Sequence, residues 1–173
     1  NFYSHDINTG LSGFNKVNTD SIDSVYLNEL KIADSSTKLN QYMNKLNHER
    51  LVDVIRLDDY MDNFEIDRIN LLKIDTQGSE LEILKGLGEY FPLLMKIEAQ
   101  VVPMYENVPS WGELLNHLYK INYMTCEWIE IGSHLTRAPV EMDMIFIPNY
   151  LTESGKKTIL SREKEFVSLM LIF

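Results

Sequence analysis

Residues 71–88 read LLKIDTQGSELEILKGLG, in which a short apolar run ends at Asp75 and a glycine turn leads directly into an amphipathic helix. In an open α/β sheet, ligands bind at the carboxyl ends of the strands, so this order brings Asp75 to the edge where sites form. Ser79 and Glu82 have the spacing of a capping box, which predicts a helix over residues 79–87. The local pattern leaves Asp75 with two interpretations, a cap of this helix or a member of a functional site.

The flanking sequence predicts further elements of an α/β sheet. Apolar runs bounded by turn residues predict strands over residues 51–57, 69–75, 93–99, 123–129 and 142–147. A short helix is expected over residues 58–63, and a capping box of Ser110 with Glu113 begins another. This order predicts a mostly parallel sheet with an antiparallel final strand.

On this pattern the chain divides into three parts of one domain. Residues 1–50 form a poorly defined lead-in segment, residues 51–150 the α/β core, and residues 151–173 a C-terminal helical extension. A length of 173 residues suits one domain with a sizeable core, and 45% hydrophobic residues is typical of globular proteins.

Four stretches carry a resemblance to a known family. Residues 54–61 read VIRLDDYM, residues 69–86 read INLLKIDTQGSELEILKG, residues 95–98 read MKIE, and residues 141–147 read EMDMIFI. In letters and spacing the first three resemble the FkbM family of S-adenosylmethionine-dependent methyltransferases, and the fourth resembles the final strand of that family. The resemblance implies a partial Rossmann-like sheet of the class I methyltransferase type.

The resemblance also implies a cofactor, a reaction and site residues. The cofactor would be S-adenosylmethionine, and the reaction O-methylation of a hydroxyl on a small molecule or glycan. Asp75, Thr76 and Gln77 would lie at the cofactor, and Asp75 would also be catalytic. Glu98 ends the next strand, so it reaches the same edge of the sheet as a second catalytic candidate. A salt bridge to a neighbouring loop is the alternative for Glu98.

Two departures from the family bear on activity. The family usually has glutamate where this chain has Gln77, so a negative charge is missing from the turn. Methyltransferases of this architecture also hold the cofactor on a glycine-containing loop after their first strand, and only Gly10 and Gly13 occur in the first 50 residues. We therefore expect this sequence to be the C-terminal part of a methyltransferase.

The histidines offer one further candidate. His134 lies between the last two expected strands and is a candidate general base near neutral pH, although most loop histidines are simply solvated. The four histidines show no metal-ligand spacing with one another or with Cys126, so no metal site is expected. The aspartates within residues 58–62 fit the first turn of a short helix, where they oppose its dipole.

Bulk composition restricts the partners. A net charge of -10 argues against a nucleic-acid backbone as the main partner, because that contact needs clustered basic residues. The lone Cys126 cannot form an internal disulfide, which agrees with a cytoplasmic location. The apolar run at residues 169–173 is too short to span a bilayer, so we expect no membrane span and interpret the run as a buried helix end or a homodimer contact.

Three functions remain open from the sequence. The first is the O-methyltransferase, for which alignment of the acceptor with the methyl group would supply much of the rate. The second is a non-catalytic binding module derived from the same fold, suggested by Gln77 and by the missing glycine loop. The third is a metal-dependent sugar-nucleotide enzyme that uses Asp75 with a divalent cation.

Overall fold

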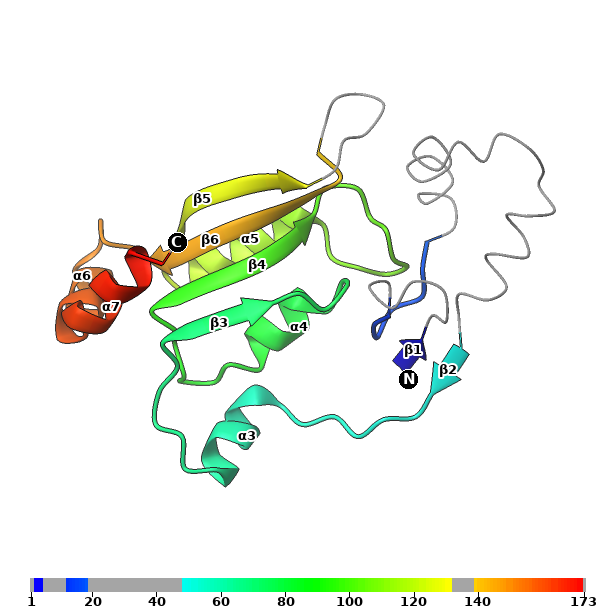
Figure 1. Ribbon diagram of the computed structural model, residues 1–173, viewed down its shortest axis with the longest axis horizontal. Coiled ribbons are helices and arrows are strands. Elements are labelled where there is room, and N and C mark those ends of the chain that lie inside the picture. Colours follow the sequence, from blue (N-terminus) through cyan, green and yellow to red (C-terminus); the bar gives the residue numbers. More distant parts are fainter. Residues whose placement is uncertain (1, 5–11, 19–47, 132–138, 173) are drawn as a thin grey trace.

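A mixed sheet of four strands forms the centre of the structure (Figure 1). In spatial order its strands are β3 (Leu71–Ile74), β4 (Leu94–Gln100), β6 (Glu141–Pro148) and β5 (Tyr123–Ile131). β3 and β4 run parallel, whereas β6 is antiparallel to both of its neighbours. This computed structural model describes residues 2–4, 12–18, 48–131 and 139–172.

The sheet confirms the mixed α/β class but not the expected strand directions. The strands around residues 71, 94 and 141 are adjacent, and the last of them is antiparallel, as the sequence predicts. A mostly parallel sheet is not confirmed, because one of the three strand pairs in the described sheet is parallel. Parallel strands need a crossover connection, and of these pairs only β3 and β4 are joined by one, through helix α4 (Glu80–Lys85). The division of the chain at residues 50 and 150 stays a prediction.

The strand expected over residues 51–57 is wrong. Residues 51–56 run without regular secondary structure, and the short helix α3 (Leu57–Asn63) begins at the end of this segment. Leu51 is 91% exposed, because no described strand lies alongside to bond its backbone or cover its side chain. The apolar run satisfies the pattern of a strand but lacks the partner that makes one.

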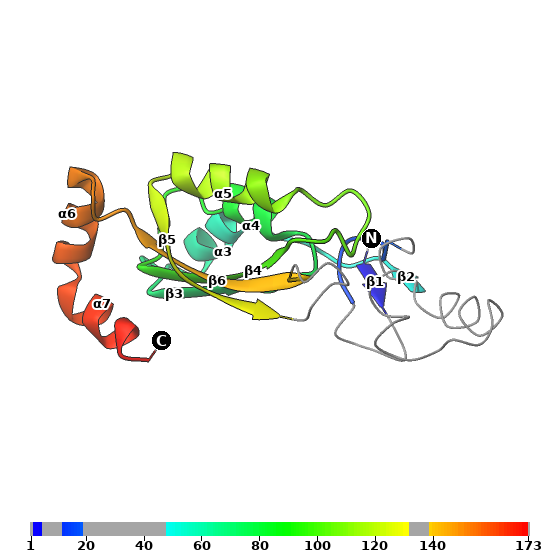
Figure 2. The same cartoon turned by 90° about the horizontal axis from the view of Figure 1, so that it is seen from above.

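Two helices cover one face of the sheet (Figure 2). They are α4 and α5 (Trp111–Lys120), which bury Leu84 and Leu118 against alternate residues of the strands. The strand residues in this core are Ile74, Met95, Ile97, Ala99, Tyr123, Met142, Met144 and Phe146. Because side chains alternate along a strand, Lys96 and Glu98 point to the opposite face.

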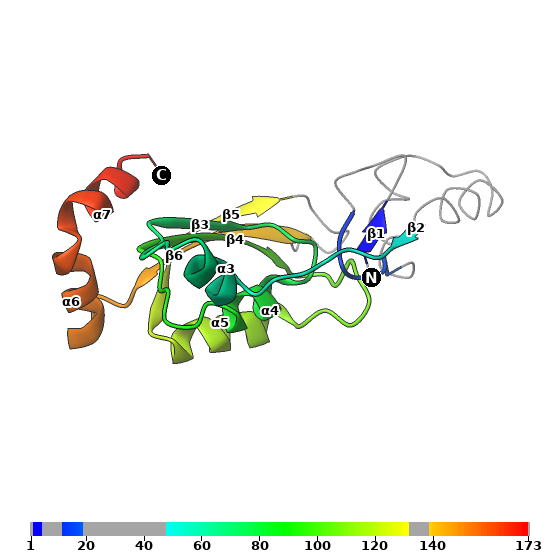
Figure 3. The ribbon, with the colours of Figure 1, turned by 90° about the horizontal axis from the view of Figure 1, so that it is seen from below.

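The opposite face is covered at one end by the C-terminal helix α7 (Glu163–Met170), and helix α6 (Glu153–Ser161), which precedes it, lies beyond the same end of the sheet (Figure 3). Leu169 of α7 packs there on Leu94 and Ile145, together with Leu93 and Ile147. The charged residues nearer the carboxyl end of β4 lie outside this apolar cluster. No helix in the described ranges has both the length and the apolar character needed to cross a membrane.

The two expected capping boxes have different outcomes. At α5 the box is formed, because Glu113 N donates to Ser110 Oγ and Ser110 N donates to Glu113 Oε2. At α4 it is wrong, since Ser79 is the N-cap but makes no side-chain cap bond. Ser79 Oγ instead accepts from Asn15 Nδ2 at 3.2 Å.

A small second sheet and a short loop stand beside the carboxyl end of the main sheet. β1 (Phe2–Ser4) and β2 (His48–Arg50) pair antiparallel. Residues 12–18 pack against the loop that follows β4, through hydrogen bonds from Asn18 N to Met104 O and from Glu106 N to Lys16 O. This contact brings the N-terminal loop next to the turn that contains Gln77.

Candidate active site

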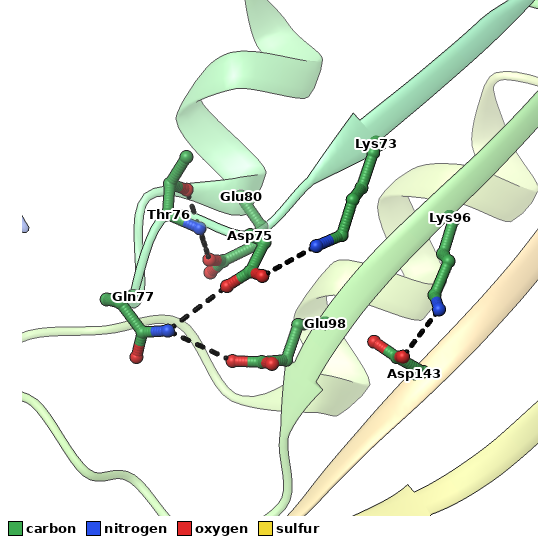
Figure 4. Close-up of polar contacts among 8 residues, drawn as sticks. All are labelled: Lys73, Asp75, Thr76, Gln77, Glu80, Lys96, Glu98 and Asp143. Atoms are coloured by element: carbon green, nitrogen blue, oxygen red, sulfur yellow. Dashed lines mark hydrogen bonds and ion pairs between the residues drawn. The ribbon is translucent and has the colours of Figure 1, made fainter. Parts of the chain in front are cut away.

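The register of β3 and β4 brings two carboxylates together. Ile74 is paired with Ile97, so Asp75, directly after β3, lies beside Glu98 (Figure 4). Glu98 does not end its strand as expected, because β4 continues to Gln100 through its pairing with β6. Gln77 Nε2 lies between them, 3.1 Å from Asp75 Oδ1 and 3.2 Å from Glu98 Oε1. The structure therefore brings together three of the residues that the sequence predicts for the site.

Asp75 is not the helix cap that the local pattern also allowed. Its carboxylate accepts from Gln77 and from Lys73 Nζ, which lies 2.9 Å from Asp75 Oδ2. The Asp75 side chain keeps 33% exposure, so a ligand can reach it from solvent. Its role in binding or catalysis stays a prediction.

Glu80 closes the turn between β3 and α4 from inside. Its Oε1 accepts hydrogen bonds from Thr76 N at 3.1 Å, Thr76 Oγ1 at 3.1 Å and Gly78 N at 3.0 Å. Glu80 is 6% exposed, so these bonds supply the partners that a buried carboxylate needs. Thr76, expected at the cofactor, thus has its hydroxyl proton engaged within the turn.

Asp75 and Glu98 belong to a row of charged side chains on the sheet face opposite α4 and α5. These residues alternate along three adjacent strands and are Lys73, Asp75, Lys96, Glu98, Glu141 and Asp143. Lys96 Nζ forms an ion pair with Asp143 Oδ2 at 2.7 Å (Figure 4). Each lysine is thus paired with an aspartate, whereas no ion pair among the described residues involves Glu98 or Glu141.

Burial and like charges act together on Glu98. Burial raises the pKa of Glu98 to about 7, with added repulsion from Glu141, Asp75 and Asp143, while the hydrogen bond from Gln77 opposes the rise. The pKa of Glu141 is also raised, first by its burial and then by Asp75 and Glu80. A carboxyl with a pKa near neutrality exists in both protonation states under ordinary conditions, as a general acid or base requires.

Sequence reasoning missed part of this arrangement. Glu80, Tyr105 and Glu141 were not singled out, although the alternating charges of the strands are a readable signal for Glu141. Tyr105 comes from a loop 28 residues away from its partner Gln77, and no local pattern indicates that contact. His134 lies outside the described residues. Within those residues, no group of three His, Cys, Asp or Glu side chains is placed to hold a metal ion.

A hollow of about 800 Å³ lies on the outer side of β3. The extended segment before α3 and helix α4 enclose it, and apolar side chains such as Val54, Leu57 and Leu72 form much of its lining. It reaches Thr76 and Ser79 in the turn but not the side chains of Asp75 and Glu98.

Comparisons with known proteins give two matches. Residues 3–124, more than half of the chain, match the family model of the methyltransferase FkbM domain. A protein named Methyltransferase 1, from Beauveria bassiana (strain ARSEF 2860), is 36% identical over 63 residues, which are 36% of this chain and 25% of that protein. The match thus spans a quarter of the relative's length. No solved structure matches the chain.

Proposed function

The chain belongs to the methyltransferase FkbM domain family, and from this premise we propose that it serves S-adenosylmethionine-dependent methylation of a hydroxyl on a small molecule or glycan. Family membership suggests methyltransferase activity in general. The observation that carries the finer proposal is the convergence of Asp75 and Glu98 on one amide at the carboxyl edge of the sheet.

The hydrogen-bond acceptors at this edge fit the cationic end of S-adenosylmethionine. A carboxylate offers about four lone-pair directions, and two bonds to Asp75 are made within the protein. The exposed side of Asp75 can therefore accept from an ammonium group, with Thr76 and Gln77 beside it. When bound, the cofactor supplies a methyl group whose bond to sulfur breaks with its electron pair returning to sulfur.

Glu98 is the proposed base for the acceptor. As the acceptor oxygen forms its bond to carbon, the hydroxyl proton passes to the Glu98 carboxylate. With a pKa of about 7, Glu98 is ionised often enough near neutrality to accept that proton and basic enough to hold it. Asp75, paired with Lys73, keeps an anionic contact next to it.

A non-catalytic binding module is the second candidate. The observation that favours it is Gln77, an amide where the family usually has glutamate. Such a module would bind the same ligands through the same edge without transferring a methyl group, and detection of methyl transfer would exclude it.

Binding of the cofactor product tests the proposal. The glycine loop of the family was not found in this sequence, so we expect weak binding, which backbone-amide NMR shifts can detect at millimolar ligand. S-adenosylhomocysteine should shift the amides of residues 75–78, whereas adenosine, which lacks the ammonium group, should not.

Two variants make this titration specific. Asp75→Asn should weaken binding about 10-fold or more, the loss expected when one hydrogen bond to a charged group is removed. Asp58→Asn is the matched control, because Asp58 is paired with Arg56 at the start of α3, away from the strand ends. Equal shifts in wild type and Asp75→Asn would contradict the assigned site.

A further inference from the structure

Gln77 adopts a strained backbone conformation at the centre of the carboxyl edge. Its φ of 58° lies in the left-handed region, where a non-glycine residue costs about 1 kcal/mol. Gly78, which follows, has a φ of 101°, and a Cβ there would meet Val108 Cγ1 at 2.2 Å. The turn is held in this conformation by Glu80, and the conformation aims the Gln77 side chain at the two carboxylates (Figure 4).

The partners of the Gln77 side chain fix the orientation of its amide. Oε1 accepts from the Tyr105 hydroxyl at 2.6 Å, and Tyr105 is 1% exposed. Nε2 has two protons, and Asp75 and Glu98 each lie within hydrogen-bond distance of it. Since ionised carboxylates only accept, a flipped amide would place its oxygen against both acids in their ionised forms and lose these bonds.

We propose that Gln77 is a positioning residue, whose single amide holds Asp75 and Glu98 side by side and stabilises the ionised form of Glu98. The use of this pair in methyl transfer rests on the proposed function, whereas the pairing itself rests on the hydrogen bonds alone. A glutamate at position 77 would bring a third carboxylate between the two acids, and it could take this place only with a proton or a cation. The amide supplies the same bridge without either.

The acidic groups around Glu98 act on its pKa in the direction opposite to the hydrogen bond from Gln77. Asp75 and Lys73 face Glu98 from the side of β3, Lys96 lies on its own strand, and Glu141 and Asp143 face it from β6. The three acids raise the pKa of Glu98, and the hydrogen bond from Gln77 is the opposing contribution. Loss of the amide should therefore raise the pKa of Glu98 above neutrality and leave it protonated.

The test is an NMR titration of the Glu98 side-chain carboxyl carbon in protein labelled with ¹³C at glutamate. Gln77→Met keeps side-chain length but has no amide, and we expect the Glu98 midpoint to rise by about one to two pH units, the equivalent of one hydrogen bond to a charged group. Gln77→Glu should raise it further. Tyr105→Phe keeps the Gln77 amide but removes the hydroxyl that orients it. The midpoint of Glu98 should therefore also rise in this variant, but by less than in Gln77→Met.

Gln77→Asn separates positioning from a structural role in the turn. Asparagine tolerates the left-handed conformation, so the fold should be retained, but its shorter amide cannot reach both acids. If Gln77 matters only for the turn, this variant will titrate like wild type. Midpoints that are equal in wild type, Gln77→Asn and Gln77→Met would overturn the proposal.

A second signal comes from Gln77 itself. In wild type, the side-chain amide protons of Gln77 should move with the same midpoint as Glu98, because they donate to it. Neither readout needs cofactor or acceptor, so a failed binding experiment with S-adenosylhomocysteine would leave this result standing, and the reverse also holds.

Discussion

Glu98 links the chemistry of the edge to the pH dependence of folding. Its pKa in the folded protein is about 7, above the ordinary value of 4.5. The folded state therefore binds a proton more readily than the unfolded chain between these values, and the stability contributed by this group is lost as pH rises through that interval. Above it, the folded protein holds an anion next to Glu141 and Asp75.

Glu98→Gln removes this charge and should stabilise the protein only at high pH. Near pH 8 we expect a gain of about 1 kcal/mol, equivalent to ~2–4 °C in Tm, because partial exposure of the side chain reduces the full effect. Near pH 5 both forms are neutral at this position, and the difference should vanish. Thermal unfolding followed by circular dichroism measures the difference in Tm at each pH. Glu153→Gln, at an exposed position on α6, is the control.

Glu80 holds the turn between β3 and α4 through three hydrogen bonds to its carboxylate. Glu80→Ala leaves Thr76 N and Gly78 N without their acceptor and should cost about 2–4 kcal/mol of unfolding free energy. Glu82→Ala, on the exposed side of the same helix, should cost less than about 0.5 kcal/mol. Urea denaturation gives both values, and equal losses would show that the buried bonds contribute little.

At the scale of elements, the two helices that cover the sheet begin differently. Ser110→Ala removes a formed capping box from α5 and should cost about 1 kcal/mol. Ser79→Ala at α4 removes no cap bond, so we expect less than half of that loss. Unfolding free energies of the two variants test this directly, and a larger loss at Ser79 would argue that its bond with Asn15 is the more important contact.

Some of the helices and strands could be predicted from the sequence alone, and others could not. The strands β4 and β6 and the helix α5 follow from apolar runs and a capping box, because these signals lie within each segment and here the neighbouring elements agree with them. The strand expected over residues 51–57 failed because a strand needs a neighbour, which a local pattern cannot report. For the same reason the sequence places Asp75 and Glu98 at one edge but gives no sign of the Tyr105 contact to Gln77.

At the scale of the whole molecule, β3 and β5 are the edge strands of the described sheet, and the edge of β3 has apolar side chains of a neighbouring segment beside it. In the described sheet β3 has a neighbour only on the side of β4, and Val54, Ile55 and Leu71 are exposed next to its other side. Open edges of this kind pair with other chains. We therefore expect this chain to self-associate through β3.

A charge at this edge should weaken the association. Val54→Lys should lower the apparent mass measured by sedimentation velocity across a concentration series, because a lysine opposes strand addition. Leu160→Lys, on exposed α6, should leave it unchanged. A wild-type chain that stays monomeric throughout the series would refute the prediction.

The register of the central strands fixes the positions of the acidic residues, whereas Tyr105, which orients Gln77, comes from a loop. Asp75 directly follows β3 and lies beside Glu98, which is paired with Asp143 across β4 and β6, and a slip of one residue would turn a whole buried face to solvent. The loop with Tyr105 is tied to these acids, because Tyr105 is buried and its hydroxyl donates to Gln77 Oε1. A mutant library confined to residues 101–109 should therefore preserve the arrangement of Asp75 and Glu98 only in members that retain Tyr105.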